Sequence, residues 1–135
     1  VAQRLDGLIA SGLSVTVVPT DLTAPSAYRA VRDFLTSETR LDAIVPGTLG
    51  QTDATIRAIT DAGLATPHDI ALASFDGPDS AYREPVPTTA VLPVEAVVDR
   101  ALDALESKDV DACVPGVALR IGQTCGCPVG RSDFD

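Results

Sequence analysis

The fold is decided by residues 56–76, which read IRAITDAGLATPHDIALASFD. Ile56 and Ile59 recur at helical spacing, and Gly63 follows the last turn, where glycine commonly ends a helix. A Pro-His-Asp turn comes next, and residues 70–75 form an apolar run with the length of a buried strand. The stretch therefore predicts a helix, a turn and a strand in that order.

The same alternation of helix and strand extends in both directions. Residues at helical spacing predict three more helices, and short apolar or β-branched runs predict four more strands. The predicted helices cover residues 2–11, 24–37, 52–62 and 94–106, and the predicted strands cover 13–18, 43–45, 70–75, 89–92 and 117–121. This pattern indicates an α/β fold, here a doubly wound parallel sheet with right-handed crossovers.

The composition fits one soluble domain and argues against direct binding of nucleic acid. The chain has 135 residues, of which 45% are hydrophobic, and its 19 acidic and 10 basic residues give a net charge of −9. Binding to phosphates needs clustered Lys and Arg, which are missing here. No apolar run approaches the roughly 18–20 residues of a membrane span, and no secretory signal pattern is found. Because Met is absent and Val1 falls inside a predicted helix, we expect a fragment of a longer protein.

Three cysteines lie near the C-terminus, at Cys113, Cys125 and Cys127. Their odd number argues against a disulfide framework and for a reducing cytoplasm. The Cys125-Gly-Cys127 pair could contribute to a metal site, but structural zinc needs four ligands and the single histidine, His68, lies far along the chain. We interpret the cysteines as incidental thiols of the C-terminal segment and predict no metal and no cofactor.

Open α/β sheets bind ligands outside the carboxyl ends of their strands, where helix N-termini present free amides. The predicted loops at this edge are residues 19–24, 46–51 and 76–83. Asp76 follows directly on a strand, so its carboxylate could accept hydrogen bonds from neighbouring sugar hydroxyls. Asp-Gly-Pro-Asp is also strong turn chemistry, and from the residues alone the turn is the first interpretation.

Several motifs, in order, resemble one family of bacterial regulators. Residues 56–76 are similar to the family pattern of a helix ending in AGL, then PxD(I/V), then an apolar strand that ends in an aromatic residue and Asp. The other similar segments are Ser26-Ala-Tyr28, Tyr82 to Pro87, Thr88-Thr89, Pro93-Val94-Glu95 and Thr124-Cys-Gly-Cys127. Together they make residues 12–127 resemble the lactose-repressor (LacI/GalR) family.

The resemblance implies a periplasmic-binding-protein-like core of two lobes that close around a small effector, such as a sugar or a nucleoside-like molecule. It implies that residues 1–127 are the C-terminal lobe, with 88–107 crossing to the N-terminal lobe and 128–135 a flexible tail. It also implies a cytoplasmic homodimer, in which helices 25–36 and 52–62 contribute to the dimer contact. A separate N-terminal helix-turn-helix would bind operator DNA.

Four ligand-binding positions follow from the resemblance, residue by residue: Asp76, Thr48, Leu22 and Arg4. Asp76 matches the strand-end acid that binds effector hydroxyls, and Arg4 matches an arginine of the preceding helix. Thr48 stands where sugar-binding members have Asn, and Leu22 stands where an aromatic ring often stacks on the sugar. These two departures, and Gly122 in place of a frequent arginine, imply an unusual effector or a lost effector response.

Two other functions stay open. An extracytoplasmic solute-binding protein has the same fold, and only the sequence upstream of Val1 would separate it from a regulator. An enzyme is not expected, because no GxSxG motif is present and no cysteine has a nearby histidine. The resemblance also implies that residues 89–92 and 94–106 lack their usual partners here, so we expect them to be poorly ordered or to pack on a neighbouring copy, unless they fold back on this lobe.

Overall fold

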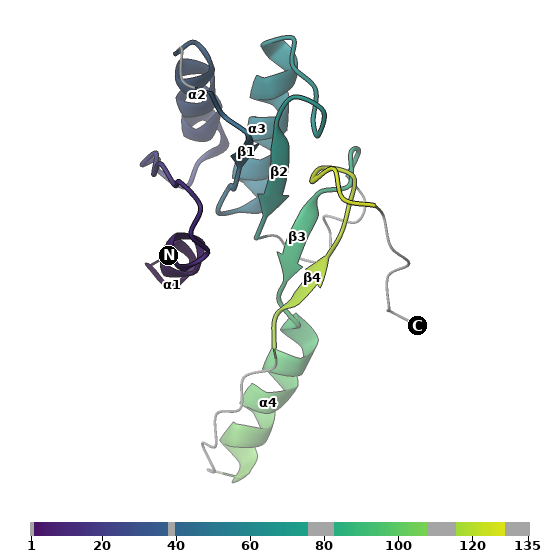
Figure 1. Ribbon diagram of the computed structural model, residues 1–135. Coiled ribbons are helices and arrows are strands. Elements are labelled where there is room, and N and C mark those ends of the chain that lie inside the picture. The colour runs from purple at the N-terminus through teal and green to yellow at the C-terminus, as the bar shows by residue number, and fades with distance from the viewer. Residues whose placement is uncertain (1, 38–39, 76–82, 108–115, 129–135) are drawn as a thin grey trace.

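The computed structural model describes residues 2–37, 40–75, 83–107 and 116–128 (Figure 1). Helices and strands alternate along most of this length, which confirms the predicted α/β class. The elements are α1 (Ala2–Ala10), α2 (Ala24–Leu35), β1 (Ala43–Ile44), α3 (Leu49–Asp61), β2 (Ala71–Ser74), β3 (Thr88–Val91), α4 (Val94–Ser107) and β4 (Ala118–Arg120). Among these described segments, no helix is long and apolar enough to cross a bilayer.

The strands form one sheet in the order β1-β2-β3-β4. The pairs β1–β2 and β2–β3 are parallel, as predicted, whereas β4 runs antiparallel to β3, with Ala90 opposite Leu119. The prediction of an entirely parallel sheet is therefore wrong at β4. A parallel return requires the connecting helix to cross over the face of the sheet. Instead α4 extends beyond the ends of β3 and β4, so the chain returns alongside β3 in the opposite direction (Figure 1).

The predicted strand at residues 13–18 is also wrong, because the structure has no strand there. Its alternating apolar side chains are exposed, including Leu13 and Val17. β-Branched residues favour an extended backbone, but a strand exists only when another strand pairs with it. The segment instead connects α1 to α2 as irregular chain.

Helices α2 and α3 pack against each other (Figure 1). Thr23 caps α2 as predicted, since its side chain accepts a hydrogen bond from the amide of Ser26. The Tyr28 hydroxyl of α2 donates to Asp61 of α3 over 2.8 Å, and Arg57 donates to the same carboxylate. Hydrogen bonding by Tyr28, followed by that of Arg57, lowers the pKa of Asp61 below its usual value. This network holds the two helices together at the end of α3.

Threonine hydroxyls form much of the core where β2, β3 and the C-terminal segment meet. Thr124 is completely buried, and its hydroxyl donates to the carbonyl of Leu72 in β2 over 2.7 Å. The same hydroxyl accepts a hydrogen bond of 2.9 Å from the amide of Thr88 in β3. Thr124 therefore joins two neighbouring strands through one side chain.

The apolar residues of α4 lie largely in solvent, because the helix extends away from α2 and α3 (Figure 1). Val97, Val98 and Leu102 are exposed, and Leu105 is 77% exposed. β3, in contrast, is ordered inside the sheet between β2 and β4. β3 thus follows the third alternative given for it, folding back on the sheet of this chain, while α4 is a formed helix whose apolar side chains stay uncovered among the described residues.

Candidate functional site

The carboxyl ends of β1 and β2 meet at one edge of the sheet, because the two strands are parallel neighbours. Residues 45–48 connect the end of β1 to the start of α3 at this edge, and Phe75 directly follows the last residue of β2. Helix α1 lies near the same end of the strands (Figure 1). This edge is where α/β sheets bind small molecules.

Arg4 of α1 reaches this edge and contacts both loops. Its Nη1 atom donates to the carbonyl of Gly47 over 2.9 Å, and its guanidinium carbon lies 4.7 Å from the centre of the Phe75 ring. Stacking on an aromatic ring and a hydrogen bond together hold the guanidinium in place. Among the described residues, no acidic side chain forms an ion pair with Arg4. Among those residues, the hydrogen bond to Gly47 and the ring contact with Phe75 hold Arg4 at the edge where a ligand would bind.

Gln51, in the first turn of α3, fixes the loops around Arg4. The side-chain oxygen of Gln51 accepts from the Gly47 amide over 3.2 Å, and its Nε2 atom donates to the Thr20 hydroxyl over 2.9 Å. Gln51 is only 7% exposed. Its amide thus joins the loop after β1 to the segment before α2, and this arrangement preorganises the edge.

Thr48 is the N-cap of α3, so this helix begins earlier than the predicted residue 52. The Thr48 hydroxyl accepts from the Gln51 amide and donates to the Gln51 side-chain oxygen, each over 3.3 Å. A capping role therefore occupies this hydroxyl, and a ligand that used it would compete with the cap.

The structure brings Arg4 and Thr48 together at this edge, through Gly47. Leu22 lies two residues after Thr20, and its side chain is 69% exposed. The preceding residue, Asp21, has a pKa lowered by hydrogen bonds from Thr23, which fixes the start of α2. Asp76 lies outside the described residues, directly after Phe75.

Two residues of the edge, Gln51 and Phe75, were missed as site residues by sequence reasoning. Gln51 had a signal, because Thr48-x-x-Gln51 is a capping-box pattern that marks the start of a helix. Phe75 was recognised only as the end of a strand. Its partnership with Arg4 joins residues distant in the sequence, and no local pattern predicts such a contact.

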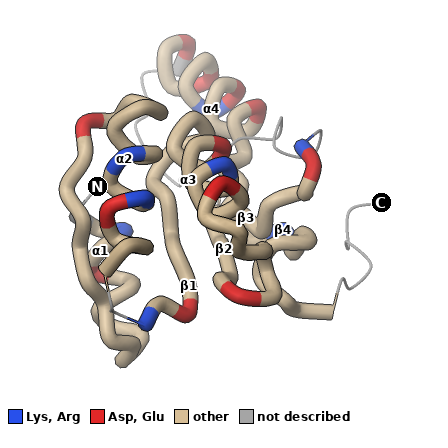
Figure 2. Tube along the Cα trace, turned by 90° about the horizontal axis from the view of Figure 1, so that it is seen from above, with Lys and Arg blue, Asp and Glu red and all other residues tan. Residues whose placement is uncertain are grey.

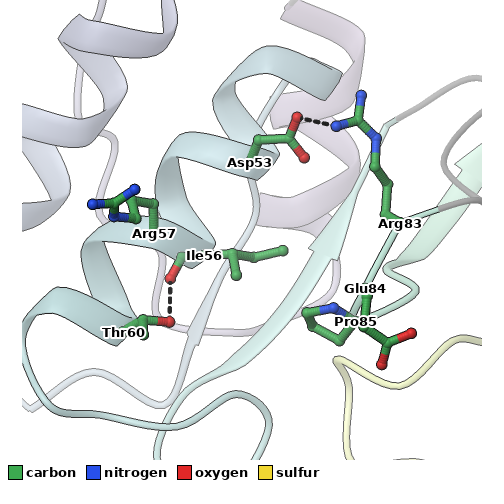
Figure 3. Close-up of a pocket in the computed structure, with 7 residues that line it drawn as sticks. All are labelled: Asp53, Ile56, Arg57, Thr60, Arg83, Glu84 and Pro85. Atoms are coloured by element: carbon green, nitrogen blue, oxygen red, sulfur yellow. Dashed lines mark hydrogen bonds and ion pairs between the residues drawn. The ribbon is translucent and has the colours of Figure 1, made fainter.

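Away from this edge, a pocket lies between α3 and residues 83–85 (Figure 3). It is an open pocket of about 380 Å³, lined by Asp53, Ile56, Arg57, Thr60, Arg83, Glu84 and Pro85. Arg83 reaches across it to Asp53, with 2.5 Å between Nη1 and Oδ2, and Ile56 points between the two elements. Both partners of the ion pair are more than a third exposed, so the pair adds little to stability.

The charges of the described residues do not form a basic face. Figure 2 shows their Arg residues scattered over several elements and interspersed with acidic ones. With a net charge of −9 for the chain, this surface is unsuited to the phosphate backbone of DNA.

Comparison with known proteins identifies the family. No family model matches the chain. A curated protein, the lactose operon repressor of Rhizobium radiobacter, is 36% identical over 81 residues, which are 59% of this chain and 72% of that protein. The chain belongs to the LacI family of transcriptional regulators.

Solved structures of LacI-family regulators have the same fold. A regulator from Arthrobacter sp. FB24 in complex with lactose superimposes with a TM-score of 0.75 at 23% identity, covering 91% of this chain and 48% of that one. A second structure of the regulator from that organism gives 0.74 at 25% identity, covering 92% and 49%. A dimeric Lac repressor gives 0.68 at 23% identity, covering 81% and 42%. This LacI-family chain therefore spans about half the length of the solved structures it matches.

Proposed function

We propose that this chain is the C-terminal lobe of a LacI-family effector-binding domain, and that a sugar or similar polar molecule binds at the carboxyl edge of β1 and β2. The observation that carries the proposal is Arg4, whose guanidinium is held at this edge between the Gly47 carbonyl and the Phe75 ring. The lactose complex of the Arthrobacter regulator supports a sugar as the ligand class. Asp76, which follows Phe75, would add a carboxylate acceptor for hydroxyls.

The experiment is calorimetric titration of the full-length protein, after a thermal-shift screen of sugars and nucleosides has found a binder. The variant Arg4→Ala is expected to bind that molecule about 10- to 100-fold more weakly, because a hydrogen bond to a charged group contributes about 1.5–3 kcal/mol. Arg40→Ala is the matched control. It removes the same charge from a side chain that is 90% exposed at the opposite end of β1, and should leave the affinity unchanged.

Equal affinities for Arg4→Ala and the wild-type protein would remove Arg4 from the site. A screen in which nucleosides bind and sugars do not would exclude sugars as the effector class. Leu22 and Thr48 belong to the same proposal as lesser contacts, since Leu22 offers only apolar surface and the Thr48 hydroxyl caps α3.

For the whole protein we propose a cytoplasmic transcription regulator that binds operator DNA through a separate N-terminal helix-turn-helix, and that is not an enzyme. The names of the curated repressor and of the LacI-family regulator structures described above support this. In this organisation residues 88–107 cross to the N-terminal lobe, which would cover the exposed apolar residues of α4. The alternative, an extracytoplasmic solute-binding protein, is favoured only if the preceding sequence carries a secretory signal.

We also propose that two copies associate through α2 and α3, as a homodimer. The similar Lac repressor structure is described as dimeric, and Ile56 of α3 lines the open pocket between that helix and residues 83–85 (Figure 3). The variant Ile56→Glu should weaken dimerisation of the full-length protein by about 2 kcal/mol or more, roughly 30-fold, because it places an unpaired charge in the contact. Sedimentation equilibrium measures this.

The control is Leu13→Glu, which adds the same charge at an exposed apolar residue outside α2 and α3. If both variants dimerise like the wild-type protein, α3 does not carry the contact.

A further inference from the structure

Cys125 and Cys127 lie close together on the two sides of a turn at Gly126. The amide of Cys127 donates to the Cys125 sulfur over 3.3 Å, and the Cys127 thiol lies 4.0 Å from the Cys125 carbonyl oxygen. Gly126 between them has a φ of 72°, in the left-handed region that glycine adopts without strain. The backbone therefore turns so that each sulfur contacts the backbone of the other cysteine.

The two sulfurs have different environments. Partial burial raises the pKa of Cys125, but hydrogen bonds from Cys127 and Thr88 outweigh this, so the pKa lies below the ordinary thiol value. The pKa of Cys127 is raised, chiefly by its hydrogen bond to Cys125. As pH rises, Cys125 is thus the first of the pair to become a thiolate, which is the nucleophilic form of cysteine.

The two residues also differ in how firmly they are held. Thr124 ties the chain before Cys125 to the sheet, and the amide of Leu72 donates to the Thr124 carbonyl over 2.7 Å. Cys127 is exposed, and both thiols are free. A fixed thiol beside an exposed one suits a nucleophile and its resolving partner. Among the described residues, no cluster of three metal-ligating side chains includes the pair.

We propose that Cys125 and Cys127 are a redox-active dithiol that a hydroperoxide oxidises to an intramolecular disulfide. The Cys125 thiolate attacks the terminal peroxide oxygen, an S–O bond forms, the O–O bond breaks, and the alkoxide leaves with a proton as alcohol or water. The product is a sulfenic acid. Cys127 then loses its proton and attacks this sulfur, so that the S–S bond forms and the sulfenic oxygen leaves as water. The two thiols give two electrons to the peroxide.

The sequence provides a direct readout, because trypsin cleaves after Arg120 and Arg131. The resulting peptide, residues 121–131, contains Cys125 and Cys127 without Cys113. After mild treatment of the native protein with hydrogen peroxide, mass spectrometry should show that the mass of this peptide has decreased by the mass of two hydrogen atoms. A dithiol reductant should restore it. The peptide that contains Cys113 is the internal reference for nonspecific oxidation.

Two variants assign the roles. Cys127→Ser should stop the reaction at a sulfenic acid on Cys125 that a dimedone label traps. Cys125→Ser should slow oxidation at the pair about tenfold or more, because it removes the thiol that becomes a thiolate first. Equal rates in the two variants, a disulfide only between molecules, or a 121–131 peptide that resists peroxide as long as the Cys113 peptide would each overturn the proposal. None of these outcomes depends on the effector site.

Discussion

The variant Thr124→Val is expected to lower the free energy of unfolding by about 2–4 kcal/mol. Valine has the shape of threonine but neither donates nor accepts a hydrogen bond. The Thr124 side chain is completely buried, so the carbonyl of Leu72 and the amide of Thr88 would both lose a partner that water cannot replace. Each unsatisfied buried group costs about 1–3 kcal/mol. The substitution therefore removes one hydrogen bond to β2 and one to β3.

Urea unfolding followed by circular dichroism measures this, with Thr66→Val as the matched control. The Thr66 hydroxyl oxygen is buried and has no hydrogen-bond partner among the described residues, so its removal should cost nothing or stabilise slightly. The same substitution is thus made at two threonines that differ in hydrogen bonding. If Thr124→Val unfolds at the same urea concentration as Thr66→Val, the Thr124 hydroxyl does not join the strands as described.

The variant Gly122→Ala is expected to destabilise the protein by about 1–3 kcal/mol, the usual cost of overpacking. A Cβ atom at this position would lie 2.3 Å from the carbonyl oxygen of Val86, and 2.7 Å from both the carbonyl carbon and the carbonyl oxygen of Pro87. These are backbone atoms directly before β3, so they cannot rotate away like a side chain. The Gly122 amide also donates to the Thr88 hydroxyl over 2.9 Å, which holds the two segments of the chain close together.

Gly50→Ala is the control for glycine substitution itself, because a Cβ there meets nothing within 4 Å. Gly50 lies inside α3, where alanine is preferred by about 0.5–1 kcal/mol, so this variant should be slightly more stable than the wild-type protein. The thermal midpoint is therefore expected to fall for Gly122→Ala and to rise slightly for Gly50→Ala. A midpoint of Gly122→Ala equal to or above that of the wild-type protein would mean that residues 86–87 move aside and that the close approach is not rigid.

The parts of the fold that could be predicted are those with a local cause. The apolar spacing and Gly63 defined the end of α3, and the apolar run after the Pro-His-Asp turn defined β2. Thr23 was recognised as the cap of α2 for the same reason. In each case the residues that decide the structure lie within one or two helical turns of each other.

The errors concern elements that depend on a distant partner. Residues 13–18 have the composition of a strand but no strand beside them, and the direction of β4 depends on where α4 points. The candidate site shows the same division. Arg4 was proposed through resemblance alone, and its contact with Phe75 joins residues 71 positions apart in the sequence. The Cys125–Cys127 pair was interpreted as incidental because the sequence does not show the turn in which the Cys127 amide donates to the Cys125 sulfur.

The central claim is that the effector binds at the carboxyl edge of β1 and β2, and hydrogen–deuterium exchange of the full-length protein tests it most directly. Adding the effector should slow exchange of the amides in residues 45–52, around Gly47 and Gln51, and at Phe75. Amides of residues 83–86, beside the open pocket on α3, should exchange as before. Protection confined to residues 83–86 and the outer face of α3, with no change around Gly47, would contradict the claim.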